Sequence, residues 1–141
     1  MPSGFYVPTL LDVFDATQLA VAPLADTIKV ALFTSSHTPD FSSDTAYSTT
    51  NEVPDSGAYA AGGATLGTKT FSELVSSRAT FDAADVSWAA ATISARGALV
   101  YDSTVANRAL CYIDFGSNQT SISGTFAIQF DVGGIFYFDC H

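Results

Sequence analysis

The sequence predicts an all-β protein: a β-sandwich or jelly roll of about eight short antiparallel strands, preceded by an N-terminal arm or short helix. From residue 27 onward, apolar and polar side chains alternate with the period of two that is typical of a strand with one buried face. Polar turns rich in Gly, Ser, Asn and Asp separate these segments. No helical pattern lies between them, which argues against a parallel sheet with helical crossovers.

The length of 141 residues is the usual size of one domain. We expect residues 1–26 to form the arm or short helix and residues 27–141 to form a single β-sandwich domain. Within the arm, apolar residues are spaced loosely like one helical face, with Thr9 in the position of a cap and Pro23 at the end. A short helix within residues 8–22 is therefore predicted, and an extended arm is the alternative.

The β segments follow one another at short intervals. Strands are expected at residues 27–33, 52–66, 69–71, 79–81, 86–88, 93–101, 110–115, 125–130 and 135–140. The segment 52–66 is predicted to be a short edge strand with bulges, because Pro and Gly weaken central strands. Residues 34–51 and 116–123 are predicted loops, and the last two strands are predicted to form a hairpin across residues 131–134.

The clearest strand pattern covers residues 93–101. One face would carry Ile93, Ala95, Gly97, Leu99 and Tyr101, and the other would carry Ser94, Arg96, Ala98 and Val100. Aromatic and branched side chains from several strands should supply the core. The predicted core comprises Phe33, Trp88, Leu99, Tyr101, Tyr112, Ile113, Phe126, Ile128, Phe130, Phe136 and Phe138.

Composition excludes several classes of function. Charged residues make up 13 % of the chain, about half the usual share of roughly 25 %, whereas apolar residues make up 48 %. Five Lys and Arg against fourteen Asp and Glu give a formal net charge of −9, which repels nucleic acid phosphates and anionic lipid. No apolar run approaches the ~18 residues that span a bilayer. We expect no nucleic acid and no membrane as partners, and a surface partly covered by other protein.

Chemistry-bearing residues are few. Nucleophilic catalysis needs a base beside a Ser or Cys, and the two histidines are His37, in a Ser- and Thr-rich loop that we expect to be solvated, and His141. The aspartate pairs 40/44 and 82/85 lie in turn-like segments, where Asp usually bonds its own backbone. The Gly-rich run 57–67 precedes a strand-like segment, whereas a phosphate loop precedes a helix. We expect no enzyme, no metal and no cofactor.

Three more residues carry specific expectations. Cys111 and Cys140 lie in apolar, strand-like contexts and are expected to be buried free thiols, because a disulfide does not suit a reducing compartment. Arg96 lies inside the clearest strand among small neighbours. It either points outward from a sheet face or forms an ion pair at an interface or in the interior.

Four segments occur in an order that carries a resemblance. They are DTIKVALFTSS at 26–36, EVPDSGAYAAGGATL at 52–66, ARGALVYDSTVANRALCYIDFG at 95–116 and SGTFAIQFDVGGIFYF at 123–138. In this order the chain resembles a group of small tailed-bacteriophage virion proteins that are similar to capsid cement, or decoration, proteins. The resemblance covers most of the chain and implies a β-sandwich or jelly roll without catalytic residues.

The resemblance implies a place on the virus particle. A cement protein binds the outside of an assembled capsid and stabilises it, so the major capsid protein would be the partner and the virion exterior the location. The chain would be made in the cytoplasm of the bacterial host, because no positively charged flank precedes the first apolar stretch. The alternative is a tail or fibre module that contacts a receptor, with Tyr47, Tyr59 and Trp88 as exposed aromatic side chains.

Contacts with partners are expected both in the N-terminal arm and in the β domain. The arm is too apolar for a free tail, which makes Phe5, Tyr6, Leu10, Leu11 and Phe14 candidate contact residues, although a helix that closes its own sandwich is the alternative. Tyr59, in the Gly- and Ala-rich segment, and Arg96 are the other candidates. We expect the chain to bind itself as a two-fold homodimer, with a three-fold trimer as the alternative.

Overall fold

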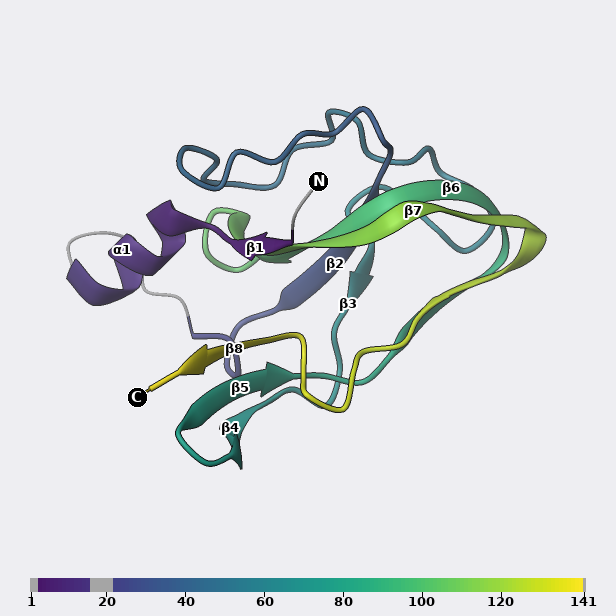
Figure 1. Cartoon of the computed structure of the whole chain (residues 1–141). Coiled ribbons are helices and arrows are strands. Elements are labelled where there is room, and N and C mark those ends of the chain that lie inside the picture. Colours follow the sequence, from purple (N-terminus) through teal and green to yellow (C-terminus); the bar gives the residue numbers. More distant parts are fainter. Residues whose placement is uncertain (1–2, 16–21, 141) are drawn as a thin grey trace.

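Two antiparallel sheets make up most of the chain in the computed structural model, which describes residues 3–15 and 22–140. The strand order is β1-β7-β6-β2-β3 in the larger sheet and β4-β5-β8 in the smaller one (Figure 1). The elements are β1 Gly4–Phe5, α1 Val7–Asp15, β2 Ile28–Phe33, β3 Ala64–Thr65, β4 Thr70–Val75, β5 Arg78–Asp82, β6 Val86–Asp102, β7 Arg108–Ile128 and β8 Phe136–Asp139. The prediction of an all-β protein with one short helix is confirmed.

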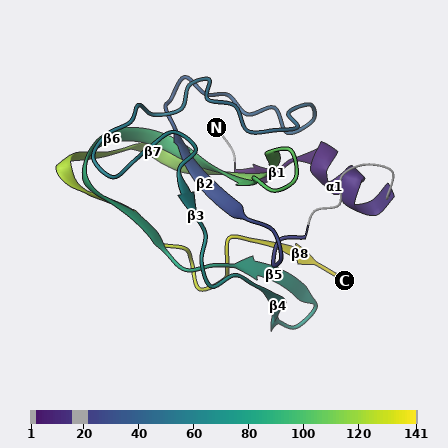
Figure 2. The ribbon, with the colours of Figure 1, turned by 180° about the vertical axis from the view of Figure 1, so that it is seen from behind.

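Strands β6 and β7 form the frame of the molecule. They have 17 and 21 residues, and Figures 1 and 2 show them running along the larger sheet and then bending down to the level of the smaller one. Their pairing shifts register several times along the bent half, and the φ angles of Ala90 and Ser123 there are 51° and 47°. Bulges bend and twist a strand pair, which allows β6 and β7 to reach from the larger sheet to the level of the smaller one without a break.

This continuity overturns two predictions. Residues 86–88 and 93–101 belong to one strand, and residues 116–123 are strand instead of loop. The polar side chains of 116–123 are mostly exposed, because this part of β7 leaves the core and keeps its backbone paired with β6. A polar segment can be a strand when its partner supplies the hydrogen bonds and solvent covers its side chains.

The main core lies between the two sheets. It contains side chains from β2, β6 and β7 of the larger sheet and Phe81 from β5 of the smaller one. The prediction that β2 has one buried face is wrong, because Ala31 and Phe33 on its other face belong to a second buried cluster with Leu99 and Tyr112. Phe41 and Tyr47, from the segment that crosses the outer face of the sheet, pack against that cluster and exclude water from it.

Strand β6 also presents its side chains differently from the prediction. The register shifts between Ala95 and Gly97, where two steps along β6 lie opposite five steps along β7, and the two faces of β6 exchange at this irregularity. Directly before the shift the odd-numbered residues of β6 face the main core, and after it the even-numbered residues do. Ile93, Ala95, Ala98 and Val100 lie in the main core, and Leu99 and Tyr101 lie in the second cluster.

The N-terminal arm is docked on the chain's own larger sheet. Strand β1 pairs with β7, with Gly4 opposite Tyr112, and the amide of Tyr6 donates to the carbonyl of Leu110 at 3.0 Å. Helix α1 begins at Val7, one residue before the predicted range of 8–22. Thr9 lies within the first turn, where its hydroxyl donates to the carbonyl of Ala109 instead of capping the helix. The predicted end at residue 23 follows residues 16–21, which lie outside the described part.

The predicted C-terminal hairpin is wrong. Strand β7 ends at Ile128, and β8 pairs with β5 in the smaller sheet, with Phe136 opposite Phe81. Residues 129–135 thus connect the two layers. The predicted edge strand at 52–66 is reduced to β3 of two residues, although it does lie at the edge of the larger sheet. Gly63, whose φ angle is 73°, precedes this strand.

Candidate functional site

His37 is not the solvated loop residue that the sequence predicts. Its half-buried ring lies 4.4 Å from the ring centroid of Phe33 and 5.3 Å from that of Tyr112. Nε2 is buried and has no hydrogen-bond partner in the described part of the chain. Burial lowers the pKa of His37, and the nearby carboxylate of Asp44 acts in the opposite direction. A neutral imidazole packed between aromatic rings holds the loop on the sheet.

The aspartate pairs hold the backbone. Asp40 accepts the amide of Ser42 at 3.0 Å, and the amide of Asp40 itself donates to Asp44 at 2.9 Å. Asp85 accepts the amide of Phe130 at 2.8 Å, which ties the end of β7 to the start of β6. Among the described residues, no group of three His, Cys, Asp or Glu side chains could hold a metal ion.

A hydrogen-bonded carboxylate that the sequence gives no reason to select lies at Glu52. It accepts the hydroxyls of Tyr47 at 2.6 Å and Tyr59 at 2.7 Å, and the amide of Gly62 at 2.7 Å. Tyr59 is 1 % exposed and so is not available to a partner, contrary to the prediction. The aromatic surface expected of a receptor-contact module is also missing at these positions, because Trp88 is buried and Tyr47 is half-buried.

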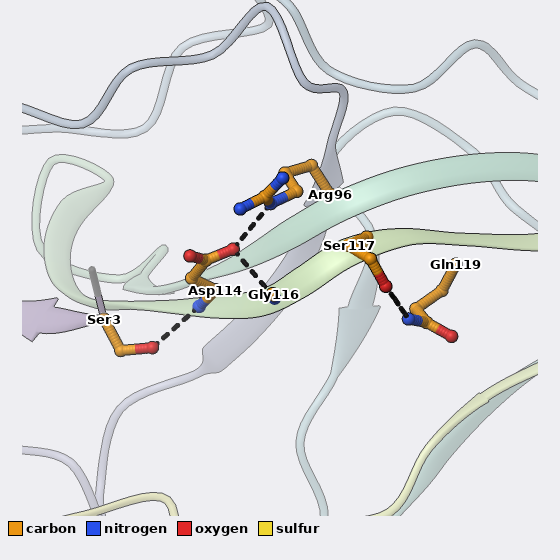
Figure 3. A network of polar contacts seen from close by, with 6 residues as sticks. All are labelled: Ser3, Arg96, Asp114, Gly116, Ser117 and Gln119. Atoms are coloured by element: carbon orange, nitrogen blue, oxygen red, sulfur yellow. Dashed lines mark hydrogen bonds and ion pairs between the residues drawn. The ribbon is translucent and has the colours of Figure 1, made fainter. Parts of the chain in front are cut away.

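Arg96 forms an ion pair within the chain. Its Nε lies 2.8 Å from Oδ1 of Asp114, which also accepts the amide of Gly116 at 3.0 Å (Figure 3). The amide of Asp114 donates to the hydroxyl of Ser3, so the arm meets the same group. The guanidinium holds the pKa of the Asp114 carboxyl well below its usual range. Arg96 is therefore occupied by its own strand partner and does not present a free charge.

Helix α1 is fastened by the side that faces the sheet. Asp12 forms an ion pair with Arg108 of β7, and both side chains are about 10 % exposed. Tyr6 is buried, and the Phe5 ring contacts the rings of Phe136 and Phe138 at 5.1 and 5.4 Å. Phe5 thus joins the two sheets of its own chain, and Tyr6 packs into the second cluster on the outer face of the larger sheet. The prediction that Phe5 and Tyr6 contact a partner is therefore wrong. For these two residues the alternative holds, in which the arm packs on its own domain.

The opposite side of α1 is apolar and exposed. Val7, Leu11 and Phe14, spaced by four and three residues, share it and form what we name the α1 outer face. Leu11 is 60 % exposed and Phe14 is 80 % exposed, whereas Leu10 beside them is half-buried. Figure 1 shows α1 at one end of the molecule, beyond the edge of the sheet. Of the candidate contact residues, Leu11 and Phe14 are thus the two that the structure leaves fully available.

The two cysteines differ. Both are free thiols, as predicted, but Cys111 is buried and Cys140 is exposed, so the expectation of burial is wrong for Cys140. Burial raises the pKa of Cys111 to about 12, which keeps this thiol protonated and unreactive. Cys140 follows the last residue of β8, a strand in which partly buried Phe136 and Phe138 alternate with exposed Tyr137 and Asp139.

Within the described ranges, no helix has both the length and the apolar character to cross a membrane. No protein-family model, no curated protein and no solved structure matches this chain.

Proposed function

We propose that this chain is a viral structural protein, a capsid cement protein that binds the outside of an assembled tailed-phage capsid and stabilises it. The observation that carries the proposal is the α1 outer face, an apolar surface on a helix that is fastened to a rigid sheet. The order of the four sequence segments supports the assignment to a virion. The major capsid protein is the proposed partner.

The way α1 is held suits a binding surface. Thr9 and Asp12 fix the inner side of the helix to Ala109 and Arg108 of β7. A helix that is ordered before it binds loses little conformational entropy on binding, so more of the free energy from apolar burial appears as affinity. Full burial of one large apolar side chain contributes about 1.5–3 kcal/mol.

Charge supports a position outside the capsid shell. The chain carries a formal net charge of −9, which disfavours a position against packaged DNA. A ligand that binds the assembled capsid and not the separated subunits stabilises the assembly by its binding free energy, which grows with the ratio of ligand concentration to Kd. The proposed action is therefore binding alone, without a chemical step. A tail or fibre module is the alternative, and it would differ in the number of copies on the particle.

Self-association belongs to the same proposal. We propose a two-fold homodimer on the particle, because two-fold pairs are the commonest closed assembly. Within the segment 57–67, which is our expected contact, Tyr59, Gly62 and Leu66 are buried in the chain's own fold. Ala58, Ala60 and Ala61 are exposed and remain available for close approach of a second backbone.

The proposal is tested with capsids that lack this chain, assembled from the major capsid protein of the same virus. The purified chain is expected to co-sediment with the capsids and to raise their temperature of disruption. Phe14→Asp and Leu11→Asp should each weaken binding by at least about tenfold, because each places a charge in the apolar contact. The matched control is Val132→Asp, an equally polar change at a side chain that is 95 % exposed in a turn away from α1.

Two results would contradict the proposal. One is a wild-type chain that does not bind capsids, and the other is binding that Phe14→Asp and Val132→Asp weaken equally. A quantitative gel of purified virions separates the cement protein from the tail module. Cement is expected in a copy number comparable with that of the major capsid protein, and a tail component in far fewer copies.

A further inference from the structure

Two carboxyl groups meet where the arm joins the β domain. Asp102 is the last residue of β6 and is 0 % exposed. Its Oδ1 accepts the amides of Thr104 at 3.0 Å and Val105 at 3.2 Å. Its Oδ2 is buried and receives no amide or hydroxyl hydrogen from the described residues. The carboxyl group of Asp26, in the turn before β2, lies in hydrogen-bonding contact with it.

The charged groups around this pair do not neutralise Asp102. Arg108 is opposite Asp102 in the strand register, but its guanidinium is paired with Asp12 of α1. Lys69, which precedes β4, donates to the backbone carbonyl of Asp26. Two carboxylates in contact repel each other strongly when both are ionised, and one shared proton removes the repulsion. Burial and the Asp26 carboxyl raise the pKa of Asp102 to about 6.

We propose that Asp26 and Asp102 share one proton and together form an acid-stabilised latch, which fastens the turn at residues 22–27 to the end of β6. The backbone at the latch is already bonded across this junction. The amide of Thr27 donates to Oγ1 of Thr104 at 2.8 Å, and the amide of Ser103 donates to the carbonyl of Thr27 at 2.9 Å. Loss of the shared proton places two negative charges against these bonds and loosens the turn.

The direction of the pH dependence follows from the raised pKa. An unperturbed aspartate has a pKa of 3.8, and Asp102 in the fold has a pKa of about 6. The folded state therefore binds the proton more tightly than the unfolded state does. Its contribution to stability is fully present below about pH 3.8 and is lost as the pH rises through about 6. Between pH 4.5 and pH 7.5 this pair alone lowers the folding equilibrium constant by roughly 25-fold.

The site suits a proton better than a metal ion. A calcium ion takes six to eight oxygen ligands, whereas two carboxyl groups and no third acidic or histidine side chain meet here among the described residues. Asp102 is completely buried, and a proton needs no additional volume. The ammonium group of Lys69 beside Asp26 further opposes a second cation.

The first experiment observes the proton directly. The ¹³C resonances of the aspartate carboxyl groups in the full-length chain are followed between about pH 3 and pH 8. One carboxyl is expected to titrate with a midpoint near 6, and this titration should be absent from Asp102→Asn. The amide of the Asn side chain imitates the protonated carboxyl, because it donates to Asp26. Titration of every aspartate below about pH 5 would overturn the proposal.

The second experiment measures the effect on stability by urea unfolding at pH 4.5 and pH 7.5. The wild-type folding constant should fall between these pH values by roughly 25-fold more than that of Asp102→Asn. Asp26→Asn should reduce this difference without abolishing it, because burial of Asp102 remains the larger cause of its raised pKa. An undiminished difference in Asp26→Asn would contradict the shared proton, which keeps the test decisive if Asp102→Asn fails to fold. Asp131→Asn, at an exposed aspartate that accepts the amide of Gly133, is the control and should behave as wild type.

Hydrogen exchange locates the effect. The amides of Thr27 and Ser103 should lose protection above pH 6 in wild type, after correction for the intrinsic rate, and retain it in Asp102→Asn. Added calcium chloride at pH 7.5 should leave the wild-type stability unchanged. Stabilisation by calcium that Asp102→Asn abolishes would show a cation site and overturn the shared proton. None of these measurements uses a capsid, so the latch can fail or hold independently of the proposed function.

Discussion

The Tyr59 hydroxyl joins the carboxylate of Glu52 to the backbone of the central sheet. Its oxygen donates to Oε1 of Glu52 at 2.7 Å and accepts the amide of Leu32, in β2, at 2.9 Å. Glu52 also holds Gly62 and Tyr47, so one carboxylate ties together both ends of the segment that covers the sheet. These hydrogen bonds help to hold the Ser- and Thr-rich segment 34–51 in place, where its side chains Phe41 and Tyr47 cover the second buried cluster.

Removal of this hydroxyl is expected to destabilise the fold. Tyr59→Phe leaves the Leu32 amide buried without its acceptor and removes one donor from Glu52, which should cost about 1–3 kcal/mol. Urea unfolding at neutral pH measures the change. Tyr137→Phe is the matched control, because Tyr137 is exposed on β8 and its substitution should change the free energy of unfolding little. Equal effects of the two substitutions would contradict the role of Tyr59.

The Arg96–Asp114 pair should govern resistance to acid. The pKa of Asp114 is depressed mainly by its bond to Arg96, so the pair's contribution to stability is present above the ordinary aspartate pKa and is lost as the pH falls through the depressed value. Arg96→Gln should therefore move the midpoint of acid unfolding to higher pH, as followed by circular dichroism. Arg78→Gln, at the more exposed pair with Asp139, should move it less.

His37 should titrate below the usual range of histidine. Burial lowers its pKa, so the imidazole contributes stability that is present above the ordinary pKa of 6.5 and is lost as the pH falls. This sign is opposite to that of the Asp26–Asp102 latch. His37→Phe keeps the ring contacts with Phe33 and Tyr112 and should remove the loss. An NMR titration of the His37 ring with a midpoint at or above 6.5 would contradict the prediction.

Close backbone approach at Gly63 gives a sharp test of the edge of the larger sheet. A Cβ atom at this residue would lie 1.8 Å from the carbonyl oxygen of Val30, and the φ angle is 73°. Gly63→Ala should therefore cost more than the ~1–2 kcal/mol of a left-handed residue alone, since the backbone must also move. Gly67→Ala meets nothing within 4 Å and should be nearly neutral. Thermal unfolding of the two variants compares these costs.

Several features of the fold could be predicted from local sequence alone. The alternation in residues 27–33 is a property of neighbouring side chains on a pleated backbone, and this segment forms β2. The absence of helical patterns after the arm and the Gly- and Pro-weakened edge near residue 64 also follow from composition and spacing. Among the candidate contacts, the apolar spacing of Leu11 and Phe14 indicated a helix face that is indeed exposed.

Tertiary structure alone decided the rest, because the deciding partners lie far away in the chain. β6 supplies the hydrogen bonds that make polar residues 116–123 a strand, and a bulge near Arg96 exchanges the faces of β6 without a signal in its alternation. Strand β8 pairs with β5 and not with β7, because residues 129–135 cross from the larger sheet to the smaller one. Tyr59 and Tyr6 became core residues because distant segments cover them, and Asp26 and Asp102 became a pair because β2 and β6 are neighbours in the sheet.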